Sequence, residues 1–334
     1  MTNNPQFQRP SFQFSARKSP LAITVGILVL IGVLFTALSG FYADWLWFKS
    51  VNFTNTWSTI LTTKATLFVV SGLLTAFIVM FNVLLAYKRR PLYVPMTVEA
   101  DNLERYRSQV EPIRRPLVIG LTIALFYFAG SAGSQMWSTW LLFKNSTPFG
   151  VTDPQFNMDI SFFAFRLPFW QTLISWGIST AILAILASVA VHYLYGGIRL
   201  QVQEDRTTVA ARVQLSVLLG LVVLLKAVAY WFDRYALALK ESRLITGLTY
   251  TDVNAVLPAK AILTGIAIVC SLLFFANIVR RSWVLPAAGT ALLVVSSVLI
   301  AGLYPGAIQQ FQVKPSESSK EAPFIQRNID ATRA

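Results

Sequence analysis

The sequence predicts an all-α fold, a polytopic membrane helix bundle with about seven transmembrane helices. Hydrophobic residues make up 55% of its 334 residues, charged residues only 13%, and the mean hydropathy is +0.57. A bilayer-spanning helix needs about 20 mostly apolar residues. Such runs occupy residues 21–47, 58–87, 117–140, 170–195, 213–232, 259–279 and 283–304. None of them alternates apolar and polar residues as a membrane β-strand would, so helices are expected to satisfy the backbone in lipid.

The first run has a secretory signal peptide as its alternative interpretation, because Arg17 and Lys18 precede it. The apolar part of a signal peptide is about 7 to 15 residues long, and this run is nearly twice that length. We interpret it as a retained helix.

Orientation follows from the distribution of Lys and Arg, which favour cytoplasmic connections. A cytoplasmic N-terminus gives the cytoplasmic segments fifteen Lys and Arg residues and the opposite side eight at most. We therefore expect a cytoplasmic N-terminus and an extracytoplasmic C-terminus. The net charge of +13 is then partly a topology signal, and no nucleic-acid partner is expected because the basic residues flank apolar runs.

Three segments follow from this topology: 1–20 is a cytoplasmic N-terminal segment, 21–304 the seven-helix domain, and 305–334 the start of an extracytoplasmic region. The last segment is polar, and we expect it to be the start of a larger, soluble extracytoplasmic region. In the longest cytoplasmic connection, Leu103, Tyr106, Val110 and Ile113 recur at helical spacing beside arginines. This pattern predicts a short amphipathic helix, either on the inner leaflet or solvated.

The predicted outer side is rich in aromatic residues, including most of the nine tryptophans. Tryptophan prefers the membrane interface, so these residues either anchor the bundle or form a platform on which an extracytoplasmic partner docks. The connection at 147–170 is expected to place a phenylalanine-rich segment along the membrane surface. Its candidate outer-surface contacts are Asp153, Asp159, Arg166 and Trp170.

A calcium ion is an alternative role for the acidic part of that connection, since Asp153, Asn157 and Asp159 carry oxygen ligands. Their spacing matches no calcium loop. Turn and capping roles are favoured instead.

Lys226 is the unusual residue of the apolar runs, because it lies inside VLLKAVAYWFDRY at 223–235. A charge within a span costs about 2.5 to 3.5 kcal/mol on insertion scales unless it is paired or wetted. Helical side chains lean toward the helix N-terminus, here the cytoplasmic side, which makes outward snorkelling awkward and favours an internal partner. The candidate intramembrane polar cluster is Lys226, Tyr230, Asp233, Asp44 and Asp252.

The residue composition limits the catalytic and metal-binding chemistry of the chain. The chain has one histidine, His192, and one cysteine, Cys270, which excludes a histidine or cysteine metal cluster within one chain. It carries no HExxH, GxSxG, P-loop or GxGxxG sequence. We expect no catalytic, cofactor-binding or metal-binding residues, no cofactor and no enzymatic activity.

Small residues predict close helix contacts in the bundle. Gly177, Ala181, Ala184 and Ser188 form a stripe along one run, and Gly130 and Gly133 offer a second site or loosen the helix there. Paired Gly- or Pro-broken helices, which are typical of inverted-repeat transporters, are not evident.

Several strings, among them FGVTDPQFNMDISFFAFRLPFW, YTDVNAVLPAKAIL and EAPFIQRNIDATRA, resemble a family of large, uncharacterised bacterial membrane proteins found mainly in actinobacteria. The resemblance runs from the first span to the last residue. It implies seven N-terminal membrane helices followed by a large extracytoplasmic domain, in the bacterial plasma membrane, and it carries over no functional residue.

The function expected from the sequence is noncatalytic: a membrane anchor or scaffold subunit of a bacterial envelope complex, with the lipid bilayer and a membrane or extracytoplasmic protein as partners. The alternative is a transporter or channel for a small solute, ion or lipid, using the polar cluster around Lys226. The sequence does not define an oligomeric state.

Overall fold

The computed structural model of the chain describes residues 20–91, 98–201, 206–242, 245–280 and 282–333. Over these residues, seven helical stretches are long and apolar enough to cross a membrane, which confirms the predicted helix bundle. The chain divides into two compact units, Met1–Thr62 and Thr63–Ala334. Each unit is described by itself.

The first unit contains α1 (Pro20–Ser50) and the start of α2 (Thr54–Lys88). A tight turn joins them, with Asn52 at φ 60°, a left-handed conformation that asparagine tolerates well. The backbone N–H of Phe53 donates to the Phe48 carbonyl at 2.9 Å. Most side chains of α1 are exposed apolar groups on all faces, the composition of a helix that needs lipid or other helices around it.

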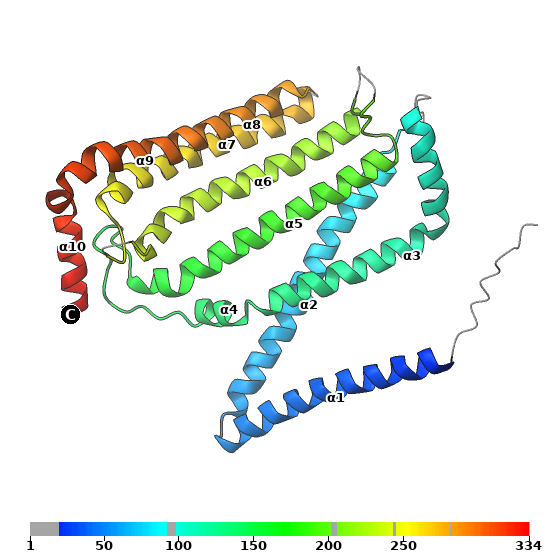
Figure 1. Cartoon of the computed structure of the whole chain (residues 1–334), viewed down its shortest axis with the longest axis horizontal. Helices are drawn as coiled ribbons and strands as arrows, with labels where there is room; N and C mark the ends of the chain where they lie inside the picture. The colour runs from blue at the N-terminus through cyan, green and yellow to red at the C-terminus, as the bar shows by residue number, and fades with distance from the viewer. Residues whose placement is uncertain (1–19, 92–97, 202–205, 243–244, 281, 334) are drawn as a thin grey trace, which may run out of the picture. The chain divides into compact units, whose positions relative to one another are not determined.

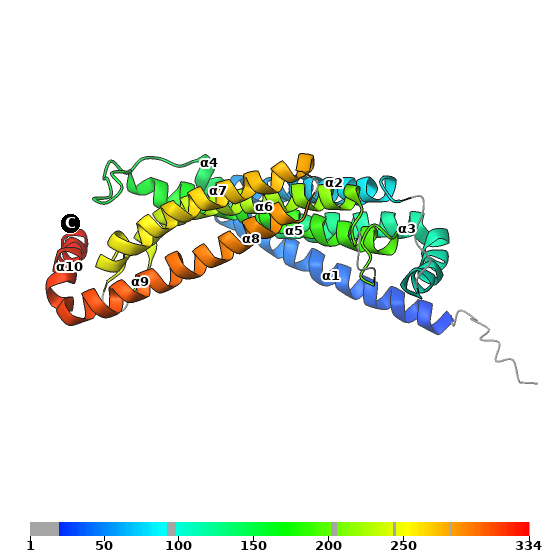
Figure 2. The ribbon, with the colours of Figure 1, turned by 90° about the horizontal axis from the view of Figure 1, so that it is seen from above.

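In the second unit, α5 (Leu167–Leu194), α6 (Val209–Ala236) and α7 (Leu257–Arg280) run side by side, and α8 (Val284–Ser296) lies along α7 (Figures 1 and 2). The rest of α2 packs on α5 and α6. This packing buries Val79, Met80 and Val83 of α2 with Ala184 of α5 and Leu218 of α6. The small-residue stripe of α5 therefore faces the core, as its spacing predicts.

Helices α2 and α3 (Val98–Ser134) approach closely where both carry glycine. A Cβ on Gly72 would lie 2.6 Å from the Phe126 carbonyl, and one on Gly130 would lie 2.7 Å from the Phe68 carbonyl. Ser71 Oγ donates across the same contact to the Ala129 carbonyl at 3.1 Å. Backbone contact of this kind requires glycine and is typical of membrane helices.

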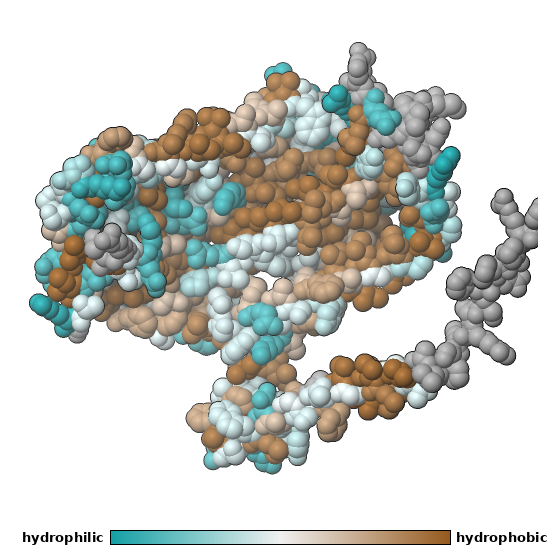
Figure 3. All heavy atoms as spheres, in the orientation of Figure 1, coloured by the Kyte–Doolittle hydropathy of each residue, from teal (hydrophilic) through white to brown (hydrophobic). Residues whose placement is uncertain are grey.

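The face of the second unit that Figure 3 shows is apolar across its middle and more hydrophilic toward both ends. Leu183 and Leu186 of α5 and Ile262, Val269 and Leu272 of α7 are among its exposed large apolar side chains. Without a bilayer such a surface would associate nonspecifically. The chain is a multi-pass membrane protein in contact with lipid.

The third predicted span differs from the observed helices at both ends. The amphipathic segment around Tyr106 is not a separate helix: it is continuous with the span in α3, which bends (Figure 1) and contains Pro112 and Pro116. Proline removes one backbone hydrogen bond and bends a helix without necessarily ending it. At the other end α3 stops at Ser134, and a short α4 (Trp137–Lys144) follows.

The phenylalanine-rich segment and the polar tail are also more helical than expected. Phe162–Arg166 is a π-helical turn that leads into α5, with Phe163 buried. After α8, the chain continues through Ser297–Leu303, α9 (Tyr304–Ala307) and Ile308–Val313 to α10 (Glu317–Arg333). Figure 1 shows α10 turned away from the direction of the preceding helices. Residues 305–333 are thus helical, and α10 contacts the connections at the same end of the bundle.

Candidate functional site

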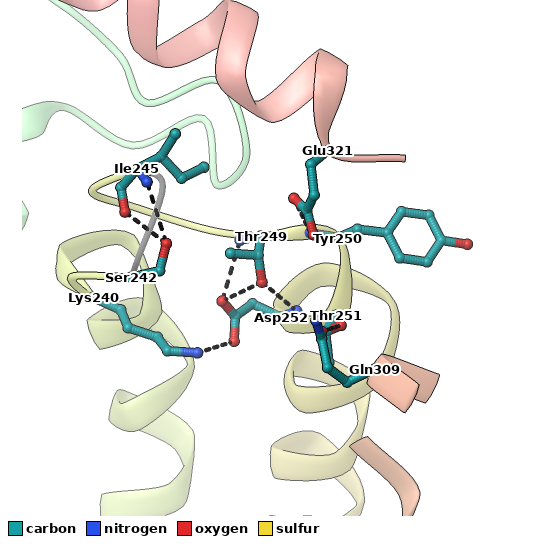
Figure 4. A network of polar contacts seen from close by, with 9 residues as sticks. All are labelled: Lys240, Ser242, Ile245, Thr249, Tyr250, Thr251, Asp252, Gln309 and Glu321. Atoms are coloured by element: carbon teal, nitrogen blue, oxygen red, sulfur yellow. Dashed lines mark hydrogen bonds and ion pairs between the residues drawn. The ribbon is translucent and has the colours of Figure 1, made fainter. Parts of the chain in front are cut away.

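The main polar site of the second unit lies at the end of the bundle where α10 meets the connection between α6 and α7 (Figure 4). It begins with a capping box at the start of the helix that leads into α7. Thr249 Oγ accepts from the backbone N–H of Asp252 at 3.3 Å, and the Asp252 carboxylate accepts from the backbone N–H of Thr249 at 3.2 Å. This reciprocal arrangement satisfies two backbone donors that a helix start leaves free.

Asp252 is 1% exposed, and a buried carboxylate requires compensation. Lys240 supplies it, with Nζ 2.7 Å from Oδ1. The Thr249 hydroxyl donates to the other oxygen at 2.8 Å. The capping group is therefore also the acceptor that ties the end of α6 to the start of α7.

Glu321 of α10 reaches the same helix start from a distant part of the chain. It is 5% exposed, and both of its carboxylate oxygens accept from the backbone N–H of Tyr250, at 3.2 and 3.1 Å. A carboxylate is favoured there because backbone N–H groups and the positive end of the helix dipole converge at a helix N-terminus. Lys320 lies 4.4 Å above the Tyr250 ring centroid, and Phe324 meets the same ring edge-on.

Further along α10, two more side chains bind the connections of this end. Asn328 Nδ2 donates to the Thr246 carbonyl at 2.8 Å, and Arg327 Nη1 donates to Gln155 Oε1 at 3.4 Å. Thr246 lies between α6 and α7, whereas Gln155 lies between α4 and α5. Helix α10 therefore joins two connections that are distant in sequence.

A polar cavity of about 340 Å³ lies beneath α10. Its lining includes two lysines and two glutamates, Lys240, Lys314, Glu317 and Glu321. Oxygen and ammonium groups face a common space here, so the cavity has the chemistry to hold water or a small polar molecule. Among the residues that the structure describes, no three His, Cys, Asp or Glu side chains are grouped to hold a metal ion.

The candidate outer-surface carboxylates hold the 147–161 connection together. Asp159 accepts from the backbone N–H groups of Phe149, Gly150 and Ser161 at 3.1, 2.9 and 2.8 Å. Hydrogen bonds from Ser161 and from these backbone donors hold the pKa of Asp159 well below its usual range. Asp153 accepts from two backbone N–H groups of its own turn, at 2.9 and 2.7 Å. These are the turn roles favoured from the sequence.

Arg166 and Trp170 lie at the start of the helical stretch that contains α5. Arg166 is exposed, and its Nε lies 3.4 Å from Ser146 Oγ. Trp170 is 37% exposed and stacks on Phe232 at a centroid distance of 6.0 Å. It therefore contributes to an internal aromatic group as well as to the surface.

The residues predicted to surround Lys226 form separate contacts. Lys226 is exposed on the second unit, and its Nζ lies 4.9 Å from the centroid of the Tyr230 ring, one turn toward the predicted outer end. The flexible four-carbon stem thus reaches outward despite the backward lean of the Cα–Cβ bond. Asp233 pairs with Lys260 at 3.2 Å and Asp252 with Lys240.

Asp44 is an exposed residue of the first unit. Its predicted pairing with Lys226 would join the two units, so the proposed membership of Asp44 and the intramembrane role of Lys226 stay predictions.

A buried polar network inside the bundle was not singled out from the sequence. Gln214 Oε1 of α6 lies 3.0 Å from His192 Nε2. Gln214 Nε2 donates to the Asn82 carbonyl at 2.9 Å and to Ser188 Oγ at 3.2 Å. Three helices, α2, α5 and α6, meet there. His192 is 1% exposed and Gln214 4%, so this histidine lies in the core of the bundle and not at its surface.

A second buried polar contact joins α6 and α7, where Asn277 Nδ2 donates to Ser216 Oγ at 2.7 Å and Ser271 Oγ donates to the Gly220 carbonyl at 2.9 Å. Both buried polar contacts could have been anticipated from an Asn or Gln inside an apolar run, since such side chains need hydrogen-bond partners there.

The apolar exterior, the seven helical stretches and the polar ends define a multi-pass helical membrane protein. A family model described as "Uncharacterised protein family (UPF0182)" matches residues 21–334, and the chain belongs to this family.

Its relatives are bacterial. A UPF0182 protein of Streptomyces coelicolor is 47% identical over 324 residues, which cover 96% of this chain and 32% of the relative. A UPF0182 protein of a Nocardioides species is 45% identical over an alignment that covers 98% of this chain and 33% of the relative. A UPF0182 protein of Thermobifida fusca is 45% identical over an alignment that covers 95% of this chain and 31% of the relative. The chain thus spans about a third of the length of these relatives. No solved structure matches it.

Proposed function

We propose that this chain is a noncatalytic membrane anchor and scaffold, and that α10 is the element through which the bundle holds an extracytoplasmic region or partner. The observation that carries the proposal is the buried contact of Glu321 with the Tyr250 N–H at the start of the α7 stretch. A helix attached only by its preceding residue would swing freely. The contacts of Arg327 and Asn328 extend this attachment over two further connections.

The two faces of α10 support this role. Its inward face carries Glu321 and Phe324 at helical spacing, whereas Gln326, Asp330 and Arg333 are exposed. A polar, charged face is suited to a solvated protein surface, since the rim of a protein interface is usually polar. The predicted orientation places it outside the cell, where the family resemblance implies a large domain in the longer relatives.

The test uses the full-length protein, extracted from native membranes in mild detergent after chemical cross-linking. Mass spectrometry then identifies the cross-linked sites and any protein recovered in a fixed ratio. We expect α10 to cross-link either to the extracytoplasmic part of its own chain or to one recurrent partner. Random cross-links at the level of other surface helices would contradict the proposal.

A variant sharpens this test. Glu321→Ala removes the buried carboxylate, and Gln326→Ala on the exposed face of the same helix is the matched control for cross-linking pattern and folding. Loss of the native cross-links in Glu321→Ala but not in Gln326→Ala would support the attachment. Equal patterns in all three proteins would refute it.

A transporter or channel is the second candidate function, favoured by the cavity of about 340 Å³ at the same end of the bundle. The discriminating measurement is solute or ion flux into liposomes that contain the full-length protein. Flux that is lost in Lys226→Met would favour transport, and a fixed-ratio partner that survives this substitution would favour the scaffold.

A further inference from the structure

The opposite end of the second unit carries a second pocket, of about 410 Å³, formed by the ends of α2 and α5 and the first half of α3. Arg90, Arg107, Glu104, Glu111 and Tyr195 line it together with Pro91 and Ser108. Two of its lining residues directly follow apolar helices: Arg90 comes two residues after α2, and Tyr195 one residue after α5. The pocket therefore lies just beyond the ends of two apolar spans, where a bilayer has its head groups.

The two carboxylates of the pocket are already matched by cations. Glu111 pairs with Arg114 at 2.8 Å and accepts from the hydroxyls of Tyr87 and Tyr195 at 3.1 and 3.0 Å. Burial, and then the hydrogen bond to Glu111, raise the pKa of Tyr195 to about 12, so its hydroxyl stays a donor.

Glu104 pairs with Arg107 Nη1 at 3.1 Å. The Nε of Arg107 donates to the Leu194 carbonyl at the end of α5 at 2.5 Å, while its Nη2 is buried with no hydrogen-bond partner among the described residues.

Arg90 is the cation that remains. Among the residues that the structure describes it forms no ion pair, and its guanidinium is held by aromatic faces, 4.3 Å from the Tyr87 ring centroid and 5.4 Å from that of Tyr195. Stacking on rings orients a guanidinium and leaves its edge N–H groups free to donate. The pocket thus presents one guanidinium that two rings orient and that forms no ion pair within 4 Å, although it lies near enough to Glu111 for an electrostatic attraction. Beside it, Nη2 of Arg107 has no hydrogen-bond partner among the described residues.

We propose that this pocket binds the phosphate group of an anionic phospholipid, with Arg90 as the principal contact. Arginine suits phosphate because its planar fork donates two parallel hydrogen bonds. A lipid is favoured over free phosphate because the pocket adjoins the lipid-facing ends of two spans. In the predicted orientation it opens to the cytoplasmic leaflet, the leaflet that attracts basic segments through anionic lipids.

The experiment measures binding to the purified full chain in a neutral detergent by native mass spectrometry. The probes are dioctanoyl phosphatidylglycerol, dioctanoyl phosphatidylcholine and inorganic phosphate. Arg90→Gln is compared with Arg89→Gln, which removes the same charge from the neighbouring exposed residue. We expect phosphatidylglycerol to bind at least fivefold more weakly to Arg90→Gln and with unchanged affinity to Arg89→Gln.

Three outcomes would overturn the proposal. Equal weakening by both substitutions would indicate diffuse surface charge. Equal binding of phosphatidylglycerol and phosphatidylcholine to the unsubstituted chain would show that the pocket does not select an anionic lipid, because phosphatidylcholine carries the same phosphate beside a compensating choline cation. Inorganic phosphate that binds as tightly as phosphatidylglycerol would assign the pocket to a soluble anion. Arg90→Lys, which keeps the charge but not the stacked fork, is expected to retain part of the affinity.

Discussion

Close backbone contact between α2 and α3 makes a sharp prediction for Gly130→Ala. The added Cβ would lie 2.7 Å from the Phe68 carbonyl oxygen and 3.0 Å from a carbon of the Phe68 ring. The carbonyl belongs to a helix backbone and cannot rotate away, so the two helices must separate. Overpacking of this kind costs about 1–3 kcal/mol, whereas alanine gains up to about 1 kcal/mol over glycine in helix propensity.

The matched control is Gly120→Ala in the same helix, where an added Cβ meets no atom within 4 Å. Both substitutions gain the same propensity, so the difference between them isolates the contact. We expect Gly130→Ala to be less stable than Gly120→Ala by about 1–3 kcal/mol. The assay is unfolding of the purified chain by SDS in mixed micelles, followed by tryptophan fluorescence.

Equal free energies of unfolding for the two variants would refute the close approach of α2 and α3. Gly72→Ala provides an independent check, since its Cβ would meet the Phe126 carbonyl at 2.6 Å from the other side of the same contact. Because either substitution alone would separate the helices, the double variant should cost less than the sum of the two.

Three further predictions concern polar side chains. Gln214→Leu removes the group that contacts His192 and should lower the free energy of unfolding in the SDS assay by about 1–3 kcal/mol, because buried polar groups lose their partner. Asp159→Asn should destabilise the chain at pH 7. The pKa of Asp159 is depressed in the folded chain, so its carboxylate contributes to the free energy of unfolding above the unfolded pKa of about 3.9. That contribution is lost as the pH falls toward the folded pKa. The free energies of unfolding of the unsubstituted chain and of Asp159→Asn should therefore be closer at pH 3 than at pH 7. Lys226→Met should leave the stability unchanged or higher, because the ammonium contacts only the Tyr230 ring among the described residues; a marked loss of stability would reveal a further partner.

Composition and periodicity were sufficient to predict the helix bundle and its seven spans, because few structures satisfy the backbone hydrogen bonds of a chain in lipid. The same reasoning offered Gly130 and Gly133 either as a second site of close packing or as a point that loosens the helix, and the structure shows close packing at both. It failed where helices continue through residues that usually interrupt them. Pro112 and Pro116 bend α3 without ending it, and the apolar side of α10 is too narrow to stand out in a polar tail.

The candidate site was predictable only in part. Asp252 could be recognised as polar and near a span end, but its partner Lys240 lies on the far side of a turn whose path the sequence does not specify. Glu321 is 71 residues from the backbone N–H that it accepts from. Long-range polar contacts of this kind follow from the packing of helices and not from local pattern, which is also why the contact of Gln214 with His192 was missed.

The distribution of charge in the second unit favours a static role over a transport cycle. Asp252 and Asp233 are each held by a lysine, at 2.7 and 3.2 Å, and both pairs join neighbouring helices near one end of the bundle. A transport path would require charged groups near the middle of the spans that face a shared cavity and change partners. Lys226, inside the apolar run at 213–232, is exposed, and its ammonium lies over the Tyr230 ring one turn toward the end of its own helix. Pairs that tie α6 to α7 in this way would instead keep the surface beneath α10 in one geometry, which suits the anchor role that we propose.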